Sequence, residues 1–292
     1  MKNSHGIIER FDERENVFAR RDLQPGTLEY EEFYRRFPEL KSMDDALRSR
    51  PYIGYKAVPA DRGMFYAPAW YMLKIGHPDM VDGAPAEKRE PISPERAAAK
   101  IKSFARRLGA DLVGISRFHP QYAYSHRGRP HYRELEPWGM PIEVNHRYAI
   151  SMGFREDLQL IRSAPHSPEM LESGLIYAKT ATASVILAQY IRALGYPARA
   201  HHFRNYQILS VPPAVDAGLG ELARCGFLLT KEHGSCLRLS TVTTDLPLEI
   251  DQPVDIGVQD FCETCKLCAE SCPSGAIPTG GKTMVRGVNK WQ

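Results

Sequence analysis

Apolar residues recur at helical spacing between positions 93 and 108, and a short apolar run follows directly. Ser93 is suited to cap a helix N-terminus, and Pro94 is of the type favoured at the first helical position. The helical spacing continues through Ile101, Phe104 and Leu108. Gly109 can adopt the left-handed conformation that ends many helices, and the run 110–115 is typical of a strand. The pattern predicts a helix that leads directly into a strand.

The same order of elements recurs later in the chain. A helix is predicted from about 171 to 194, Gly195 ends it, and a strand follows at 196–200. Further strands are predicted at 147–152, 207–211, 227–230 and 240–243. Helices alternating with strands predict a mixed α/β (α+β) core over 91–255, with a boundary near 251–257 and a small module over 256–292.

The first ninety residues carry prolines at short intervals, which leaves little room for a long helix. Short helices are predicted at 28–37 and 43–48 within an irregular region that packs on the core. A dense aromatic stretch follows, and packing against the main body is its favoured interpretation, with the wall of a ligand cavity as the alternative. Its members are Phe65, Tyr66, Trp70 and Tyr71.

Composition and charge restrict the function classes. The net charge of +3 comes without a basic block, which argues against nucleic acid as the main partner. Arg20 and Arg21 are not followed by an apolar stretch, so they do not form an export signal. The most apolar segment, 175–194, is interrupted by polar and charged residues, so we expect no membrane span. Cysteines gathered for metal chemistry rather than disulfides favour a reducing compartment, and the predicted location is the cytoplasm.

Four of the six cysteines lie close together near the C-terminal end: Cys262, Cys265, Cys268 and Cys272. With Pro273 they form the C-x2-C-x2-C-x3-C-P spacing that wraps a [4Fe-4S] cluster. A zinc site more often pairs two C-x-x-C hooks across a longer gap, so zinc is the minor alternative. The motif predicts a protein that transfers electrons.

In ferredoxin modules that hold two clusters, the fourth cysteine of such a run ligates the other cluster. No cysteine follows Cys272, while Cys225 and Cys236 lie upstream outside a ferredoxin-like context. Either the four local cysteines close one cluster, or the chain carries only part of a ferredoxin module. The sequence-based expectation is a truncated module.

Other catalytic motifs are missing from the sequence. Gly218 and Gly220 form a short glycine pair without the third glycine of a dinucleotide-binding loop, and a tight loop is the favoured interpretation. Neither a Ser–His–Asp signature nor H-E-x-x-H is present. The D-x-H-x-x-G motif that supplies a histidine to cobalamin is also absent, which leaves other modes of corrinoid binding open.

An ordered set of phrases from 91 to 292 resembles the reductive dehalogenases, of the soluble type without an export signal. It comprises Ile191-Arg192-Ala193-Leu194-Gly195-Tyr196-Pro197, Asn205-Tyr206-Gln207, Ala217-Gly218-Leu219-Gly220-Glu221, Gly226-Phe227-Leu228-Leu229 and Arg238-Leu239-Ser240-Thr241, closed by the cysteine run. The resemblance implies a nitroreductase-like domain that binds base-off cobalamin, followed by a bacterial-ferredoxin-like module with two [4Fe-4S] clusters in the full-length protein.

The resemblance also implies roles for single residues. Tyr177 matches the family's proton donor, Arg238 the basic residue that supports its phenolate, and Asn205 the active-site asparagine. A cation beside a phenol lowers its pKa and makes it a better acid. Without the resemblance, Tyr177 would be interpreted as packing and Arg238 as a surface charge. Residues expected to contact the corrinoid are Phe203, Ser210, Gly218 and Gly220.

The implied reaction removes halogen from an organohalide, such as a halogenated phenol, with electrons from a ferredoxin or a flavin reductase and without nucleic acid or membrane partners. Cys225 departs from the family pattern and is interpreted as a small buried apolar residue. Histidines that could line the cavity lack ligand spacing; they are His166, His201 and His202. Two alternatives remain: a reductase of the epoxyqueuosine reductase type, which uses an aspartate as proton donor, and a non-catalytic corrinoid or electron carrier.

Overall fold

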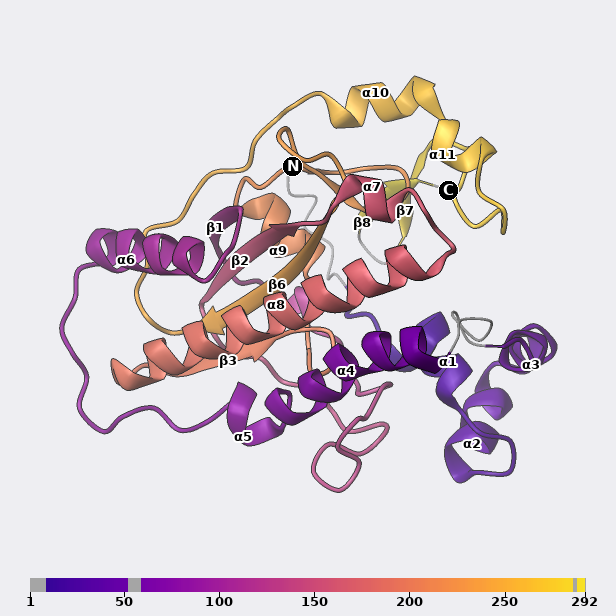
Figure 1. Cartoon of the computed structure of the whole chain (residues 1–292), viewed down its shortest axis with the longest axis horizontal. Helices are drawn as coiled ribbons and strands as arrows, with labels where there is room; N and C mark the ends of the chain where they lie inside the picture. Colours follow the sequence, from indigo (N-terminus) through magenta and orange to yellow (C-terminus); the bar gives the residue numbers. More distant parts are fainter. Residues whose placement is uncertain (1–8, 52–58, 286–287, 292) are drawn as a thin grey trace.

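The fold is taken from a computed structural model, which describes residues 9–51, 59–285 and 288–291. Its centre is an antiparallel sheet of four strands in the order β1-β2-β6-β3 (Figure 1). The strands are β1 (Leu112–Arg117), β2 (Tyr148–Arg155), β3 (Ala198–His201) and β6 (Leu237–Thr244). Two short ribbons pair β4 (Glu221–Leu222) with β5 (Leu228–Leu229), and β7 (Lys282–Val285) with β8 (Val288–Trp291). Helices combined with an antiparallel sheet confirm the predicted mixed fold class.

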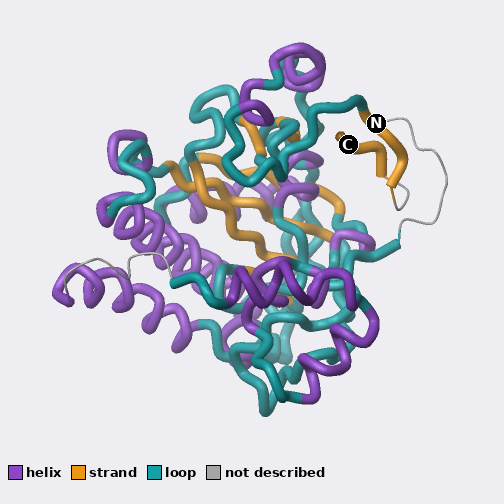
Figure 2. The backbone as a smooth tube through the Cα atoms, turned by 90° about the vertical axis from the view of Figure 1, so that its right-hand side faces the viewer, coloured by secondary structure: helices purple, strands orange, loops and turns teal. Residues whose placement is uncertain are grey.

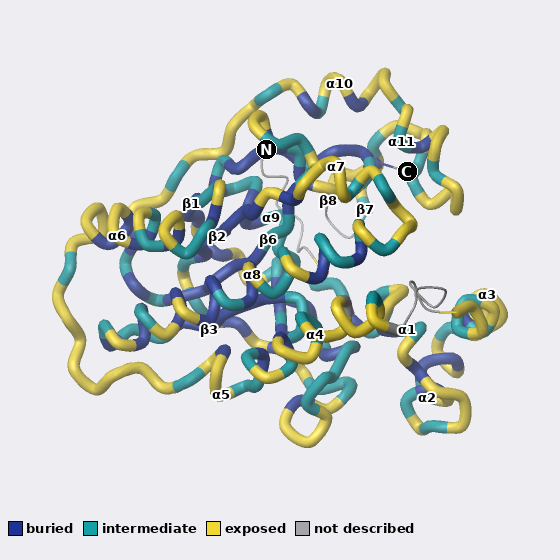
Figure 3. Tube along the Cα trace, viewed as in Figure 1, coloured by how far each residue is buried: buried dark blue, intermediate teal, exposed yellow. Residues whose placement is uncertain are grey.

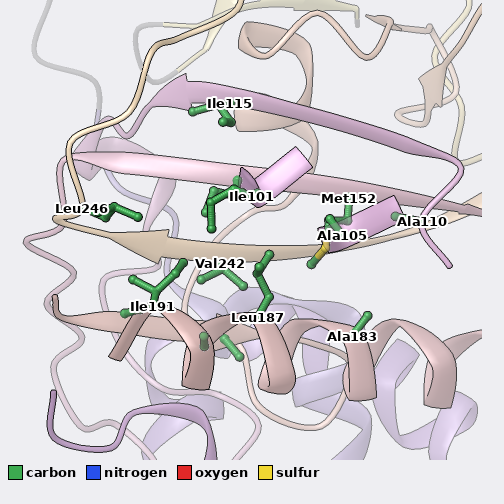
Figure 4. Packing of buried hydrophobic residues seen from close by; sticks show 14 of the residues in the cluster. Ile101, Ala105, Ala110, Ile115, Met152, Ala183, Leu187, Ile191, Val242 and Leu246 are labelled. Atoms are coloured by element: carbon green, nitrogen blue, oxygen red, sulfur yellow. The ribbon is translucent and has the colours of Figure 1, made fainter. Parts of the chain in front are cut away.

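Two long helices cover one face of the sheet: α6 (Pro94–Arg107) and α8 (Ser167–Ala193). Their apolar side chains meet those of the strands in one core, which Figure 4 shows from close by. Alternate residues of β2 point to opposite faces, so Ile150 and Met152 join this core while Ala149 joins a second one. The short helix α9 (Val211–Asp216) packs against the other face. The sheet is therefore buried on both faces at its centre.

Both helix–glycine–strand units predicted from the sequence are confirmed. The Ser93 side chain accepts a hydrogen bond from the Arg96 N–H at the start of α6, as an N-cap residue does. Gly109 and Gly195 follow α6 and α8 with φ of 94° and 83°, respectively. The glycines therefore end both helices in the left-handed conformation.

The N-terminal region begins with helices α1 (Val17–Asp22), α2 (Leu28–Arg36) and α3 (Lys41–Arg48). Short 3-10 turns occur at Glu13–Glu15, Pro38–Leu40 and, later in the chain, Pro120–Tyr122. The two short helices expected at 28–37 and 43–48 are thus present. The expectation that prolines prevent a long helix was wrong, because α4 runs from Pro59 to Ile75 with Pro68 inside it. Pro68 cannot donate a backbone hydrogen bond within the helix. The packing of α4 along α8 and the burial of Met72 offset the loss of that bond (Figure 1).

The aromatic stretch does not pack on the main body as expected. Tyr66 and Trp70 are 54% and 63% exposed, respectively. Tyr71 is also exposed, although its hydroxyl lies 3.0 Å from that of Thr182 on α8. The side chain of Phe65 lies outside the described residues. The helical period places the rings of Tyr66 and Trp70, four residues apart, on the outer side of α4, whereas only the hydroxyl end of Tyr71 reaches α8.

The prediction of a strand at 207–211 was also wrong. Ile208 makes only an isolated bridge to Ala123, and α9 begins at Val211. Pro212 and Pro213 stand in the first turn of α9, where their missing N–H groups cost nothing, so the chain turns into a helix at the end of the expected strand.

The remaining helices are short, and they include α5 (Pro78–Val81) and α7 (Leu158–Ile161). The cysteines lie on α10 (Val258–Cys265), on α11 (Leu267–Glu270) and just beyond it. We call α10, α11 and the β7–β8 ribbon the cysteine module; Figure 2 shows the β7–β8 ribbon at the edge of the molecule, apart from the central sheet. No helix within the described ranges is long and apolar enough to cross a bilayer.

Candidate functional site

The structure brings Tyr177 and Arg238 together. Tyr177 lies on α8, and Arg238 lies at the start of β6 on the face that α8 covers. The Arg238 Nη1 donates to the Tyr177 hydroxyl at 3.2 Å, and its guanidinium carbon lies 4.7 Å from the centre of the ring. Their proximity was predicted from family resemblance alone, because 61 residues separate them in the sequence. Their catalytic roles stay a prediction.

Two further polar side chains hold the Arg238 guanidinium. Its Nε donates to Glu156 Oε1 at 2.8 Å, and its Nη2 donates to the Ser173 hydroxyl at 2.8 Å. Glu156 is buried directly after β2, and Ser173 lies four residues before Tyr177 on the same face of α8. Sequence reasoning missed both residues. The i, i+4 spacing from Tyr177 could have indicated Ser173, whereas nothing in the sequence distinguishes Glu156 from other glutamates.

The environment of Tyr177 has opposing effects on its acidity. Burial raises the pKa of Tyr177 above its ordinary value; Arg238 lowers this pKa, and Glu156 raises it further. Burial therefore has a larger effect on this pKa than the cation that the family resemblance implied. Tyr177 therefore remains protonated at neutral pH, and it holds a proton that it could donate.

Tyr177 forms part of the wall of a pocket of about 330 Å³, which we call the tyrosine pocket. Phe203 stacks on Tyr177 with ring centres 4.4 Å apart and an interplanar angle of 27°. The lining contains the predicted Phe203 and Ser210, together with residues that sequence reasoning missed. The full lining is Tyr124, Tyr177, His202, Phe203, Tyr206, Ile208, Leu209, Ser210, Val211, Pro212, Gly226 and Leu239.

A larger hollow of about 510 Å³ lies elsewhere on the protein. Its lining consists of Arg89, Asn145, Arg147, Tyr196, Asp245 and Pro247. None of the predicted site residues lines it. The tyrosine pocket is the better candidate site, because it combines stacked rings with a phenol held by a cation.

His201 and His202 are buried and neutral. Burial lowers the pKa of His202, which lines the pocket, to about 4. Burial also lowers the pKa of His201, whose Nδ1 accepts the Gln207 N–H and whose Nε2 lies 2.9 Å from the Thr243 hydroxyl. Both ring nitrogens of His201 are therefore engaged. His166 is exposed and precedes α8 without lining the tyrosine pocket.

Asn205 is buried in a separate polar network. Its amide oxygen accepts hydrogen bonds from Arg199 at 2.9 Å and Arg127 at 3.3 Å. Its amide nitrogen donates to the carbonyl of Gly76 at 2.9 Å and to Glu136 at 3.2 Å. These contacts hold the segment that carries Phe203. Asn205 itself does not line the tyrosine pocket, and its proposed role at the active site stays untested.

The predicted glycines do not line the tyrosine pocket either. A Cβ at Gly220 would lie 2.0 Å from the carbonyl oxygen of Leu229, so this position needs glycine for close backbone packing. Gly218 is likewise crowded, because a Cβ there would lie 2.4 Å from the carbonyl oxygen of Gln252. Gly226 was missed: it lines the pocket with φ of 83° and has open space where a side chain would project.

The four cysteines of the motif differ in exposure. Cys262 is buried, Cys265 is exposed, and Cys268 and Cys272 are half-buried. Lys266 separates α10 from α11 with φ of 48°, so the chain turns between the second and third cysteine. The Cys272 thiol lies 3.3 Å from the Ser274 hydroxyl, and this contact, with nearby backbone N–H groups, lowers the pKa of Cys272 to about 7. Within the described part of the chain, no three His, Cys, Asp or Glu side chains converge on a single metal ion.

Most of α10 in the cysteine module is exposed, whereas the central strands are buried (Figure 3). Arg224 joins this module to the rest of the protein. Its side chain donates to the carbonyl of Cys262 at 3.0 and 2.9 Å, to that of Pro278 at 2.9 Å and to that of Gly280 at 2.7 Å. Its guanidinium also lies 4.0 Å from the ring centre of Trp291. Cys225, the next residue, packs against the same apolar cluster as Cys262 but is only half-buried, whereas it was expected to be buried.

No protein-family model matches the chain. The tetrachloroethene reductive dehalogenase of Desulfitobacterium hafniense is 36% identical over 217 residues, which are 63% of this chain and 39% of that protein. The enzyme of the same name from Sulfurospirillum multivorans is 31% identical over 253 residues, which are 76% of this chain and 50% of that protein. The solved structure of the catabolic reductive dehalogenase NpRdhA in complex with 3-bromo-4-hydroxybenzoic acid matches with a TM-score of 0.74 and 28% identity. This match covers 98% of the chain and 38% of NpRdhA.

A second group of relatives carries a different name. The epoxyqueuosine reductase of Escherichia coli is 27% identical over 220 residues, which are 64% of this chain and 54% of that protein. The chain thus spans about two fifths to one half of the length of the reductive dehalogenases that it matches.

Proposed function

Because the chain belongs to the reductive dehalogenase family, we propose that it forms the catalytic pocket and part of the electron-transfer module of a reductive dehalogenase. The reaction replaces halogen by hydrogen: an organohalide takes up two electrons and one proton and releases the dehalogenated product and a halide ion. The single observation that carries the proposal is the Tyr177 phenol, which the Arg238 guanidinium contacts at the wall of the tyrosine pocket.

The lining of the tyrosine pocket fits one face of a corrin ring. Aromatic and apolar side chains form most of it, and at Gly226 no side chain projects. Phe203, Ser210 and Gly226 would contact the bound corrinoid, in the base-off form that the family resemblance implies. A bound, reduced corrinoid would supply a cobalt centre that is both a strong nucleophile and a strong reductant.

Tyr177 would supply the proton. Carbon–halogen cleavage leaves electron density on carbon, and the Tyr177 hydroxyl transfers its proton to that carbon within the pocket. As the proton leaves, negative charge develops on the phenol oxygen, 3.2 Å from the Arg238 Nη1. The hydrogen bond from the charged Arg238 then becomes an ion pair that stabilises the phenolate.

The cysteine thiolates would hold the iron–sulfur centre that delivers the electrons. The donor set fits, because soft thiolates at this spacing suit iron–sulfur clusters, and the low pKa of Cys272 favours its thiolate form. Arg224 contacts Cys262, and Gly226, two residues later, lines the pocket. The turn from 224 to 226 therefore lies between the two sites. We expect a second cluster in the full-length protein and a small redox protein or a flavin reductase as electron donor, in a reducing compartment such as the cytoplasm.

The substrate class is an organohalide. Two of the relatives are named for tetrachloroethene, and NpRdhA was solved with a brominated hydroxybenzoic acid. The aromatic lining of the tyrosine pocket, which includes Tyr124 and Tyr206 beside Phe203, supports a halogenated phenol for this chain.

Halide release tests the proposal. The chain is reconstituted anaerobically with cobalamin, iron and sulfide, supplied with a reduced dye, and given a brominated phenol. We expect bromide and the debrominated phenol in equal amounts. Corrinoid binding without any bromide would instead support the non-catalytic carrier, and turnover of an epoxyqueuosine-containing RNA stem loop without bromide release would support the rival reductase.

A further inference from the structure

Glu156 is the one buried carboxylate in contact with the Arg238–Tyr177 pair among the described residues. Its side chain is 4% exposed, whereas that of Arg238 is 31% exposed. Its backbone is fixed as a continuation of the sheet, because its N–H donates to the carbonyl of Cys236 at 3.2 Å and its carbonyl lies 3.5 Å from the Cys236 thiol. A buried charge on so rigid a segment is costly unless it has a partner, and its charged partner is Arg238.

The contacts of Glu156 and Ser173 define where the Arg238 guanidinium lies. Nε is bonded to Glu156 at 2.8 Å, Nη2 to Ser173 at 2.8 Å, and only Nη1 is directed to the Tyr177 hydroxyl. The Ser173 hydroxyl also lies 3.3 Å from Glu156 Oε1 and 2.9 Å from Glu169 Oε1, so it is itself held in place. A planar guanidinium bonded at two of its three nitrogens has little freedom to rotate.

We infer that Glu156, with Ser173, is the positioning residue that fixes Arg238 against Tyr177, so that the proton-donating phenol is preassembled before any ligand enters the pocket. The inference rests on the proposed role of Tyr177 and deepens it. Glu156 contacts neither the pocket nor the Tyr177 hydroxyl, and it acts through Arg238.

The charge of Glu156 and its hydrogen-bonding position have opposite effects on Tyr177, which makes the inference testable. The charges that act on the phenol belong to Arg238, Glu156 and Arg129. Glu156→Gln removes the negative charge and keeps an oxygen that can accept the Arg238 Nε–H, so the pKa of Tyr177 should fall. Glu156→Ala removes the acceptor as well and releases Arg238, whose effect is the larger one, so the pKa of Tyr177 should rise.

The experiment measures the ionisation of the phenol at position 177 directly. Tyr177 is replaced by 3,5-difluorotyrosine, whose phenol ionises well below that of tyrosine, and fluorine NMR follows its titration in the chain without corrinoid. Glu156→Gln should shift the midpoint down and Glu156→Ala should shift it up, while Glu156→Asp should restore most of the wild-type behaviour. Glu172→Gln is the matched control and should change little, because Glu172, on α8 like Tyr177, accepts a hydrogen bond from the Asp157 N–H without contacting Arg238.

An unchanged midpoint in Glu156→Gln, or shifts of the same sign in the Gln and Ala variants, would overturn the inference. If Glu156→Ala does not fold, Glu156→Gln alone tests the inference. An unchanged or raised titration midpoint in Glu156→Gln would then contradict it. Because the titration needs no turnover, it stands even if Tyr177 proves dispensable for dehalogenation. In the loaded enzyme, Glu156→Ala should lower turnover roughly tenfold, less than the loss of the phenol itself.

Discussion

The tyrosine pocket and the cysteine module differ in how far the protein chain alone completes them. The pocket collects residues from distant segments and gives Tyr177, Arg238 and Glu156 a closed set of hydrogen bonds. The cysteine module takes its four thiols from eleven consecutive residues, 262–272, yet leaves Cys265 exposed and the thiols without convergence on a single ion. The comparison indicates that the pocket is organised by folding, whereas the module needs its cluster to become organised.

The largest effect is expected from a substitution that prevents cluster binding in the cysteine module and leaves the tyrosine pocket intact. Cys265→Ser removes a cluster ligand, so the broad visible absorption of a reconstituted iron–sulfur centre should be lost. The fold should survive, because Cys265 is exposed and makes no core contact. Iron and sulfide analysis after anaerobic reconstitution checks this. Cys236→Ser is the control, since Cys236 lies beside Glu156 and should leave the iron content unchanged; stoichiometric zinc without sulfide in the wild-type chain would contradict the cluster assignment.

Lowering the pH should reduce folding stability through buried histidines near the tyrosine pocket rather than through the cysteine module. Burial lowers the pKa of His202 to about 4, below its value in the unfolded chain, so the unfolded state binds the proton first as the pH falls. The contribution of His202 is complete above about pH 6.5, and by pH 5 about 2 kcal/mol of folding stability should be lost through this residue. His201, whose pKa is also lowered by burial, adds to the loss, while positions 258–292 contain no histidine.

Urea unfolding at pH 7 and pH 5 measures this loss. His202→Gln should reduce the difference between the two pH values, and His119→Gln, at an exposed position, should leave it unchanged. Equal losses in wild type and His202→Gln would contradict the assignment of His202 as a buried neutral group.

A smaller effect is expected at the link between the two regions. Arg224→Met leaves the carbonyls of Cys262, Pro278 and Gly280 without their shared donor, at a cost of about 1–2 kcal/mol. Amide hydrogen exchange should therefore speed up roughly tenfold in α10 and α11 and remain unchanged in β2 and β6. Arg133→Met removes an arginine from an exposed ion pair with Glu29 and is the control. Equal protection of α10 in both variants would show that Arg224 does not hold the module.

Local signals in the sequence predicted the elements better than the contacts between them. The Ser93 cap and the two helix-ending glycines identified α6 and α8, because each signal acts within one turn of the helix. The proline-rich region around α4 was misjudged, since the contact with α8 that supports a helix containing Pro68 is not visible in the sequence. Aromatic density at Trp70 indicated burial, yet the helical period turns that ring outward.

The same division holds for the candidate site. Spacing alone identified the cysteines, and resemblance identified Tyr177 and Arg238, which the structure brings into contact. Glu156 could not be found from the sequence, because its importance comes from a contact across 82 positions. Asn205 resembled a site residue, but the structure places it in a buried network, and its role at the active site stays a prediction.

The central claim is that Tyr177 donates the proton to the dehalogenated carbon. The most direct test is the rate of bromide release per bound corrinoid in Tyr177→Phe, compared with wild type and with Tyr206→Phe as a control from the same pocket. Loss of one hydroxyl should leave folding and corrinoid occupancy intact, and turnover should fall about 10²-fold or more. Arg238→Met should lower turnover as well, because the phenolate loses its cation. Wild-type turnover in Tyr177→Phe at full corrinoid occupancy would contradict the account, and Tyr177 would then be only a packing residue.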